Sequence, residues 1–363
     1  MSFGSRSVTL AVKAENESPR APHDKPVSLW GRLRPEVGTQ AVRNTGLMLV
    51  LGALLLSLAI THQTFFSGTN IQVVLTNMVM LGIACSGMTL LMISGNVDLS
   101  VGSVFALIAV STALLSLDIN GYLAFFLGIP IGAAIGLING LFVWRIKISP
   151  LIITLAGMGI YLGVAELINA GNYVPTLPSS YAYFGQGYWL GINIPIWMLV
   201  IVAVATHVVL SRTTLGRHIY AVGGNREAAE ITGIRVRRLV IGLFVTNGIL
   251  IGLAAVLEAS RFDSASTQFG TNLALQAVTA VILGGVAFTG GEGSLFGVAI
   301  AVTLITVVQA ALIQYNINAF YSDVTSGALL LVAVTLDQLT HDHRERHKTV
   351  RGLRELRARE QER

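Results

Sequence analysis

The chain has 363 residues, of which 53% are hydrophobic and only 12% are charged, and its mean hydropathy is +0.68. A soluble domain carries roughly 25% charged residues, so this composition excludes a soluble globular enzyme and indicates an integral membrane protein. The net charge is +5, and the single cysteine, Cys85, excludes an intrachain disulfide.

Residues 1–42 are polar and lack an apolar core, so we expect a disordered cytoplasmic leader and not a cleaved signal peptide. Apolar stretches of about 20 residues follow, the length that crosses a bilayer core of about 30 Å. The expected spans are 45–62, 70–93, 98–117, 122–143, 150–170, 195–211, 239–260, 273–289, 295–315 and 319–337. We therefore predict an all-α transmembrane domain of ten helices over 43–337 and a basic cytoplasmic tail over 338–363.

The positions of the basic residues give the expected orientation. Of the 24 Lys and Arg, all except Arg261 fall on one side of a ten-span arrangement: before the first span, in 145–147, in 212–238 and in the tail. Because cytoplasmic loops are rich in Lys and Arg, both termini are predicted to be cytoplasmic. Basic residues beside membrane spans favour lipid headgroups, and not nucleic acid, as their partner.

Asp98 is the only formally charged residue between Arg43 and Asp118. It follows Gly95 and Asn96, which favour a turn, and it begins the third expected span. A carboxylate at that position accepts backbone N–H groups and faces the positive end of the helix dipole. Three roles are open for Asp98: a helix N-cap, a group that lines the solute path, and a proton relay.

The fourth span carries Gly128, Gly132, Gly136 and Gly140. Glycine at every fourth residue leaves one helix face bare, so a neighbouring backbone can approach closely. Gly242, Gly248 and Gly252 predict a similar face on the seventh span.

The polar residues within the spans are mostly neutral, and a buried amide needs hydrogen-bond partners. They form either interhelical hydrogen bonds or a path for a neutral polyhydroxylated solute. The candidate path residues are Asn77, Asp98, Asn139, Asn247 and Gln276.

The loop between the sixth and seventh spans contains a short predicted helix. Asn225 is placed to cap its N-terminus, Glu227 sits favourably in its first turn, and Gly233 ends it with Ile234 folding back. A helix of about two turns is unstable alone in water, so it must dock either on the protein's own inner surface or on a partner.

The segment "TTLGRHIYAVGGNREAAEITGI" resembles the cytoplasmic coupling segment of permease subunits in bacterial ABC importers for monosaccharides, of the ribose, xylose and arabinose type, with related members for autoinducer-2. "DLSVGS" at 98–103 and "ILGGVAFTGGEGSLFG" at 282–297 resemble further signatures of that family, whereas Asn96 and Glu230 depart from it. The resemblance extends over about 45–337. It implies a segment that couples the permease to an ATPase, formed by Gly224, Asn225, Glu227, Ala228, Ala229 and Gly233.

The resemblance also implies partners: an ATP-binding cassette subunit, an extracytoplasmic sugar-binding protein, and a second permease copy or paralogue, in a bacterial inner membrane. The chain itself has no Gly-Lys pair and therefore no Walker A loop, and it has no HExxH or GxSxG motif. We accordingly expect no enzymatic activity and no cofactor on this chain, ATP being used by the partner. The aromatic residues of the 171–195 loop fit either an interfacial belt or a docking platform.

Two other hypotheses remain: a secondary carrier or facilitator that acts alone, and a structural or receptor-like membrane protein. A five-plus-five inverted repeat is a further expectation, because 98–110 and 272–284 both open with a short polar residue followed by leucine. In that comparison Asn272 is the counterpart of Asp98 and is likewise predicted to cap a helix.

Overall fold

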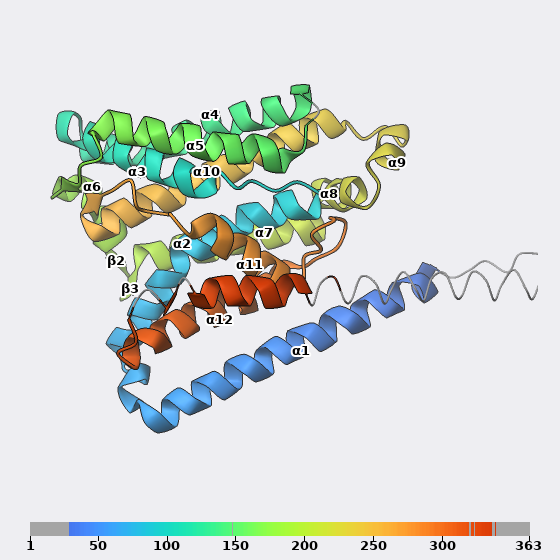
Figure 1. Ribbon diagram of the computed structural model, residues 1–363, viewed down its shortest axis with the longest axis horizontal. Coiled ribbons are helices and arrows are strands. Elements are labelled where there is room, and N and C mark those ends of the chain that lie inside the picture. The colour runs from blue at the N-terminus through green and yellow to red at the C-terminus, as the bar shows by residue number, and fades with distance from the viewer. Residues whose placement is uncertain (1–28, 147, 319–320, 323, 336–337, 339–363) are drawn as a thin grey trace, which may run out of the picture. The chain divides into compact units, whose positions relative to one another are not determined.

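In the computed structural model (Figure 1), the described residues are 29–146, 148–318, 321–322, 324–335 and 338. The chain divides into two units, Met1–Val42 and Arg43–Arg363, and the contacts below all lie within the second. The disordered leader predicted over 1–42 lies outside the described residues up to position 28. Residues 29–42 are helical instead, as the first part of helix α1 (Leu29–Thr61). The tail predicted over 338–363 lies outside them from 339 onward.

The described part is almost entirely helical. Its elements are α1 (Leu29–Thr61), η1 (Gln63–Phe66), α2 (Gly68–Ile93), α3 (Val101–Asp118), α4 (Gly121–Ile146), α5 (Pro150–Asn169), β1 (Val174–Pro175), α6 (Ser179–Gln186), β2 (Tyr188–Trp189), β3 (Ile192–Asn193), α7 (Ile194–Arg212), α8 (Thr214–Gly224), α9 (Arg226–Ile231), α10 (Val236–Phe262), β4 (Ser264–Ala265), α11 (Leu273–Leu283) and α12 (Leu295–Gln314). A further short apolar helix covers Val324–Thr335.

Eight helices of the described part are long and apolar enough to cross a membrane: the Arg43–Thr61 part of α1, and α2, α3, α4, α5, α7, α10 and α12. They match eight of the ten expected spans to within a few residues. The all-helical membrane architecture predicted from the sequence is therefore confirmed, and the count of ten full-length spans is not.

The expected span at 273–289 is wrong. The helix there, α11, has 11 residues and ends at Leu283; Gly284 is its C-cap residue, and the backbone turns through Gly285 at φ +98°. At 1.5 Å per residue such a helix is about 16 Å long, half of a bilayer core of about 30 Å. The Gly-Gly pair stops the helix because N–H groups of Gly285 and Val286 bond back to its last turn, at Ile282 O and Val281 O. The last expected span, 319–337, contains Val324–Thr335, which is also shorter than a full crossing, and its remaining ends lie partly outside the described residues.

Helix α10 is the centre of the packing. It contacts α4 along most of its length and also packs against α2 and α3, as Figure 1 shows. More than half of the apolar window of α2, α3 and α10 is buried, whereas α5 and α7 leave most of theirs exposed, as lipid-facing helices do. Two small antiparallel ribbons, β1 with β4 and β2 with β3, lie with α6 beyond the Phe262 end of α10.

The contact between α4 and α10 is made by backbone. A Cβ atom on Gly132 would lie 2.1 Å from the carbonyl oxygen of Gly248, and one on Gly136 would lie 2.3 Å from that of Phe244. The predicted glycine face of α4 is therefore confirmed over all four of its glycines. On α10 the prediction holds for Gly248 and Gly252 but is wrong for Gly242, which is exposed and where an added Cβ atom would meet no other atom within 4 Å.

We expect Gly132→Ala to destabilise the folded protein by about 1–3 kcal/mol, because the added methyl group collides with a backbone carbonyl that cannot move aside. Gly242→Ala is the matched control on the partner helix and should leave stability unchanged or slightly raised. Thermal unfolding in detergent, followed by tryptophan fluorescence, measures both. Equal melting temperatures for the two variants would contradict a glycine-mediated contact.

Candidate functional site

A cluster of polar side chains surrounds Asp98 in the interior of the bundle. The Oδ1 atom of Asp98 accepts hydrogen bonds from the backbone N–H of Ser100 (2.9 Å) and from its hydroxyl (2.6 Å). The Oδ2 atom accepts from Nδ2 of Asn247 on α10 (3.1 Å). The Asp98 residue is 3% exposed, so three donors take the place of water around the carboxylate.

The N-cap role predicted for Asp98 needs correction. The N-cap residue of α3 is Ser100, and Asp98 lies two residues earlier, in a turn. The physical reason is local, since an aspartate carboxylate readily bonds the N–H two residues on, and this turn delays the start of the helix. Asn272 does occupy the N-cap position of α11, and its side chain makes no capping hydrogen bond to that helix.

The Asp98 cluster extends from the 94–100 loop to two further helices. Asn139 of α4 donates through Nδ2 to Ser100 Oγ (2.9 Å), and Tyr161 of α5 donates through its hydroxyl to Asn139 Oδ1 (2.6 Å). The hydroxyl of Thr154, also on α5, accepts from the N–H of Leu99 (3.1 Å). Ser100, Thr154 and Tyr161 were missed from the sequence; the Asp-x-Ser spacing of 98–100 was the available signal for the first.

One atom of this cluster has no partner among the described residues. Asn247 Oδ1 is buried without a hydrogen bond and faces α2, where a Cβ atom on Gly87 would lie 2.4 Å away from it. Three of the five predicted path residues, Asp98, Asn139 and Asn247, thus belong to one site. Asn77 and Gln276 do not join it.

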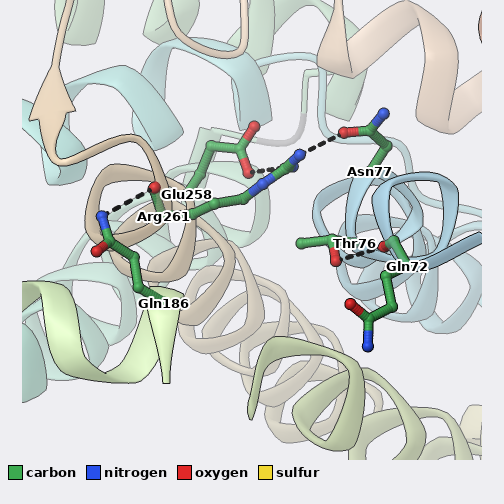
Figure 2. Close-up of polar contacts among 6 residues, drawn as sticks. All are labelled: Gln72, Thr76, Asn77, Gln186, Glu258 and Arg261. Carbon is green, nitrogen blue, oxygen red and sulfur yellow. Dashed lines mark hydrogen bonds and ion pairs between the residues drawn. The ribbon is translucent and has the colours of Figure 1, made fainter. Parts of the chain in front are cut away.

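Asn77 lies elsewhere on α2, where its Oδ1 atom accepts from Arg261 Nη2 at 2.6 Å (Figure 2). Because α2 and α10 run in opposite directions, this contact lies toward the end of the bundle opposite α9. Gln276 is half-buried on the short helix α11.

The predicted coupling helix is present as α9. Asn225 is its N-cap and accepts from the N–H of Ala228 (2.9 Å). At the other end Gly233 adopts φ +87°, and the N–H of Ile234 bonds back to Ala229 O (3.1 Å). Both ends thus follow the sequence prediction, including the αL glycine that stops the helix.

Helix α9 is attached to the bundle along one side and exposed along the other. Ala229 is buried, and the guanidinium of Arg226 lies over the ring of Trp144, 5.0 Å from its centroid. On the open side Glu227 and Ala228 are exposed, and Ile231 is 88% exposed. Gly224 and Gly233, at its flanks, are exposed as well.

The end of α8 and two loops meet at a glycine junction next to α9, formed by Gly95, Gly223, Gly224, Gly290 and Gly291. The N–H of Gly291 donates to Ile93 O, the last carbonyl of α2 (2.8 Å). A Cβ atom on Gly223 would lie 1.8 Å from the same oxygen. The junction therefore brings α8, the loop that carries Asp98 and the loop after α11 into backbone contact.

Tyr220 of α8 reinforces the junction by donating its hydroxyl to Gly293 O (2.8 Å). Burial raises the pKa of Tyr220 above its usual value, so the phenol remains protonated and able to donate at neutral pH.

The family model described as "branched-chain amino acid transport system / permease component" matches residues 70–334. The chain belongs to this family of transport permeases. It is 34% identical over 310 residues to the L-arabinose ABC transporter permease protein AraH of Azospirillum brasilense, covering 85% of this chain and 91% of that protein. It is 35% identical over 300 residues to the ribose import permease protein RbsC of Bacillus subtilis, covering 82% and 93%.

A third relative is the autoinducer 2 import system permease protein LsrC of Photorhabdus luminescens, 31% identical over 294 residues and covering 81% of this chain and 88% of that protein. No solved structure matches the chain significantly. The resemblance drawn from the sequence motifs is confirmed: this is a multi-pass membrane permease of the ABC-importer class, which is a class of transporters and not of enzymes.

We expect Gly223→Ala to lower the stability of the permease by about 1–3 kcal/mol, because its methyl group would displace the Gly291–Ile93 hydrogen bond. Gly224→Ala is the neighbouring control, since open space surrounds that position. The melting temperatures of the two variants in detergent test this. Equal melting temperatures for Gly223→Ala and Gly224→Ala would show that the junction is loosely packed.

Asp98→Asn should preserve the fold. The amide of Asn247 can turn over, so that its Oδ1 atom, now without a partner among the described residues, accepts from the new side chain. Asp98→Leu removes all three acceptor contacts and should cost several kcal/mol, at about 1–3 kcal/mol for each stranded donor. Yield and melting temperature of the two purified variants test this; equal loss in both would mean that the negative charge itself is required.

Proposed function

We propose that this permease moves a neutral monosaccharide, delivered by an extracytoplasmic binding protein, across a bacterial inner membrane. ATP is hydrolysed by a separate partner subunit. The substrate class is supported by the printed names of relatives that import ribose and L-arabinose at 33–35% identity. The neutral amides and hydroxyls of the spans supply hydrogen bonds suited to such a solute.

The observation that carries the coupling proposal is helix α9, capped at both ends, attached through Ala229 and open through Ala228 and Ile231. Six residues cannot form a stable helix alone, and this one is held in shape by the permease itself. Because α9 is already helical and directly follows the glycine junction, its movement is transmitted to the bundle better than the movement of a flexible loop would be.

The proposed orientation follows the basic residues and places α8, α9 and both termini in the cytoplasm. Arg226 is the first residue of α9, and Arg235, Arg237 and Arg238 follow the helix, as the positive-inside rule expects of a cytoplasmic segment. In the working assembly two permease copies, or one copy and a paralogue, sit with two ATPase subunits. The inverted repeat remains part of this proposal, supported by the paired polar starts of α3 and α11.

We expect Ala228→Trp to reduce sugar-dependent ATP hydrolysis and uptake by at least tenfold, about 1.4 kcal/mol of lost coupling, while the permease stays folded. The substitution keeps the N–H that Asn225 binds and adds bulk only to the exposed side. Leu167→Trp adds similar bulk at an exposed position of α5 and is the control. Undiminished uptake in Ala228→Trp would show that α9 is not the coupling element.

The decisive experiment co-purifies the permease with its ATPase and measures which sugar-loaded binding protein stimulates ATP hydrolysis. Liposomes that hold the permease alone provide the counter-test. Solute flux through them without an ATPase would contradict the proposal that a partner's ATP hydrolysis drives transport.

A further inference from the structure

A second polar site lies near the Phe262 end of α10, away from the Asp98 cluster. It is a pocket of about 290 Å³ between the first turns of α2, the end of α6 and α10. Its polar lining consists of Thr69, Gln72, Thr76, Gln186, Asn193 and Arg261. Figure 2 shows Gln72, Thr76, Gln186 and Arg261 together with the neighbouring Asn77 and Glu258.

The charge in this pocket is already compensated. Arg261 Nη1 lies 3.6 Å from Glu258 Oε2, one helical turn away, and both side chains are largely buried, at 19% and 14% exposure. Asn77 Oδ1 accepts a hydrogen bond from the other terminal nitrogen of the guanidinium, Arg261 Nη2, at 2.6 Å. The pair therefore fixes the arginine in place and gives the lining directional hydrogen bonds without net charge.

The amides at the rim are held weakly. Gln186 Nε2 donates to Arg261 O at 3.3 Å, and Gln72 Nε2 donates to Gly191 O at 3.3 Å. Both bonds are longer than the usual 2.9–3.0 Å and so are easily exchanged for a solute hydroxyl. Tyr188, which also lines the pocket, is 61% exposed and offers an aromatic face beside these amides.

We propose that this pocket binds a neutral, monosaccharide-sized polyol as it enters the permease. A volume of about 290 Å³ lies just below the roughly 300–1,000 Å³ of pockets for drug-sized ligands, as expected of a site for a smaller solute. A zwitterionic amino acid would need a cation and an anion free to receive it, whereas the Arg261–Glu258 pair satisfies its own charges. The inference rests on the proposed function and adds to it the place and the chemistry of solute entry.

Labelling of an introduced cysteine gives a direct test, because the chain has only one native cysteine. Cys85 is buried, so a thiol introduced by Gln186→Cys in the assembled complex reacts with a membrane-impermeant maleimide over a low background. The sugar that stimulates ATP hydrolysis should slow this reaction several-fold, and L-leucine at the same concentration should not. Tyr183→Cys is the control, because Tyr183 is exposed on the same helix but lies outside the pocket. The rate at which this cysteine reacts should not change when the sugar is added. Equal rates with and without sugar at Gln186→Cys would overturn the proposal.

A transport assay gives the second arm. Gln72→Trp fills the pocket and should lower sugar uptake at least tenfold, while the loaded binding protein still stimulates ATP hydrolysis. Ile71→Trp, one residue away and exposed, should transport normally. Full uptake in Gln72→Trp would refute the pocket as an entry site. In contrast, absence of ATPase stimulation by any sugar-loaded binding protein in the unsubstituted complex would refute the proposed function itself.

Discussion

The close approach of α4 to α10 is the constraint on which the rest of the bundle depends. Lipid offers no hydrophobic drive between two apolar helices, so attraction must come from dispersion at short range. Carbonyl oxygens of Gly248 and Phe244 occupy the space where side chains on α4 would otherwise lie. This contact fixes the position of α10, and α10 carries Asn247 to one polar site and Arg261 to the other.

The hydrogen bonds of the Asp98 cluster depend on this fixed position of α10. A carboxylate inside the bundle costs several kcal/mol unless its donors stand at the right places. Ser100 provides two of them locally, and Asn247 provides the third from a distant helix. A small rotation of α10 would break the bond to Asn247, so the buried charge favours one arrangement of α3 against α10. The 94–100 loop that holds this charge also contributes Gly95 to the glycine junction. At that junction the end of α8 lies against Ile93 O, and α9 follows α8 directly.

Much of this fold could be predicted because membrane crossing leaves a strong mark on composition. Eight spans, the glycine face of α4 and the caps of α9 followed from apolar length, four-residue spacing and the chemistry of Asn225 and Gly233. The errors came where backbone geometry overrides composition. The 273–289 stretch is mostly apolar, yet Gly284 and Gly285 end its helix and turn the chain. The side chains that complete the Asp98 cluster come from three helices, α4, α5 and α10. No local pattern reveals which of several buried amides will meet.

The two polar sites share a position that the sequence did not show: both lie where α10 faces α2. Asn247 Oδ1 faces Gly87, and Arg261 binds Asn77. The two α10 residues are 14 positions apart, about 21 Å along the helix and most of a bilayer core of about 30 Å. The glycine face of α10, turned toward α4, has no room for a solute. A polar solute needs groups that replace its water, and the side of α10 facing α2 carries such groups at two depths. Separation of α2 from α10 would therefore break the Arg261–Asn77 hydrogen bond and uncover Asn247 Oδ1, two groups that a sugar hydroxyl can bind. Separation of α4 from α10 would instead break dispersion contacts that a sugar cannot replace.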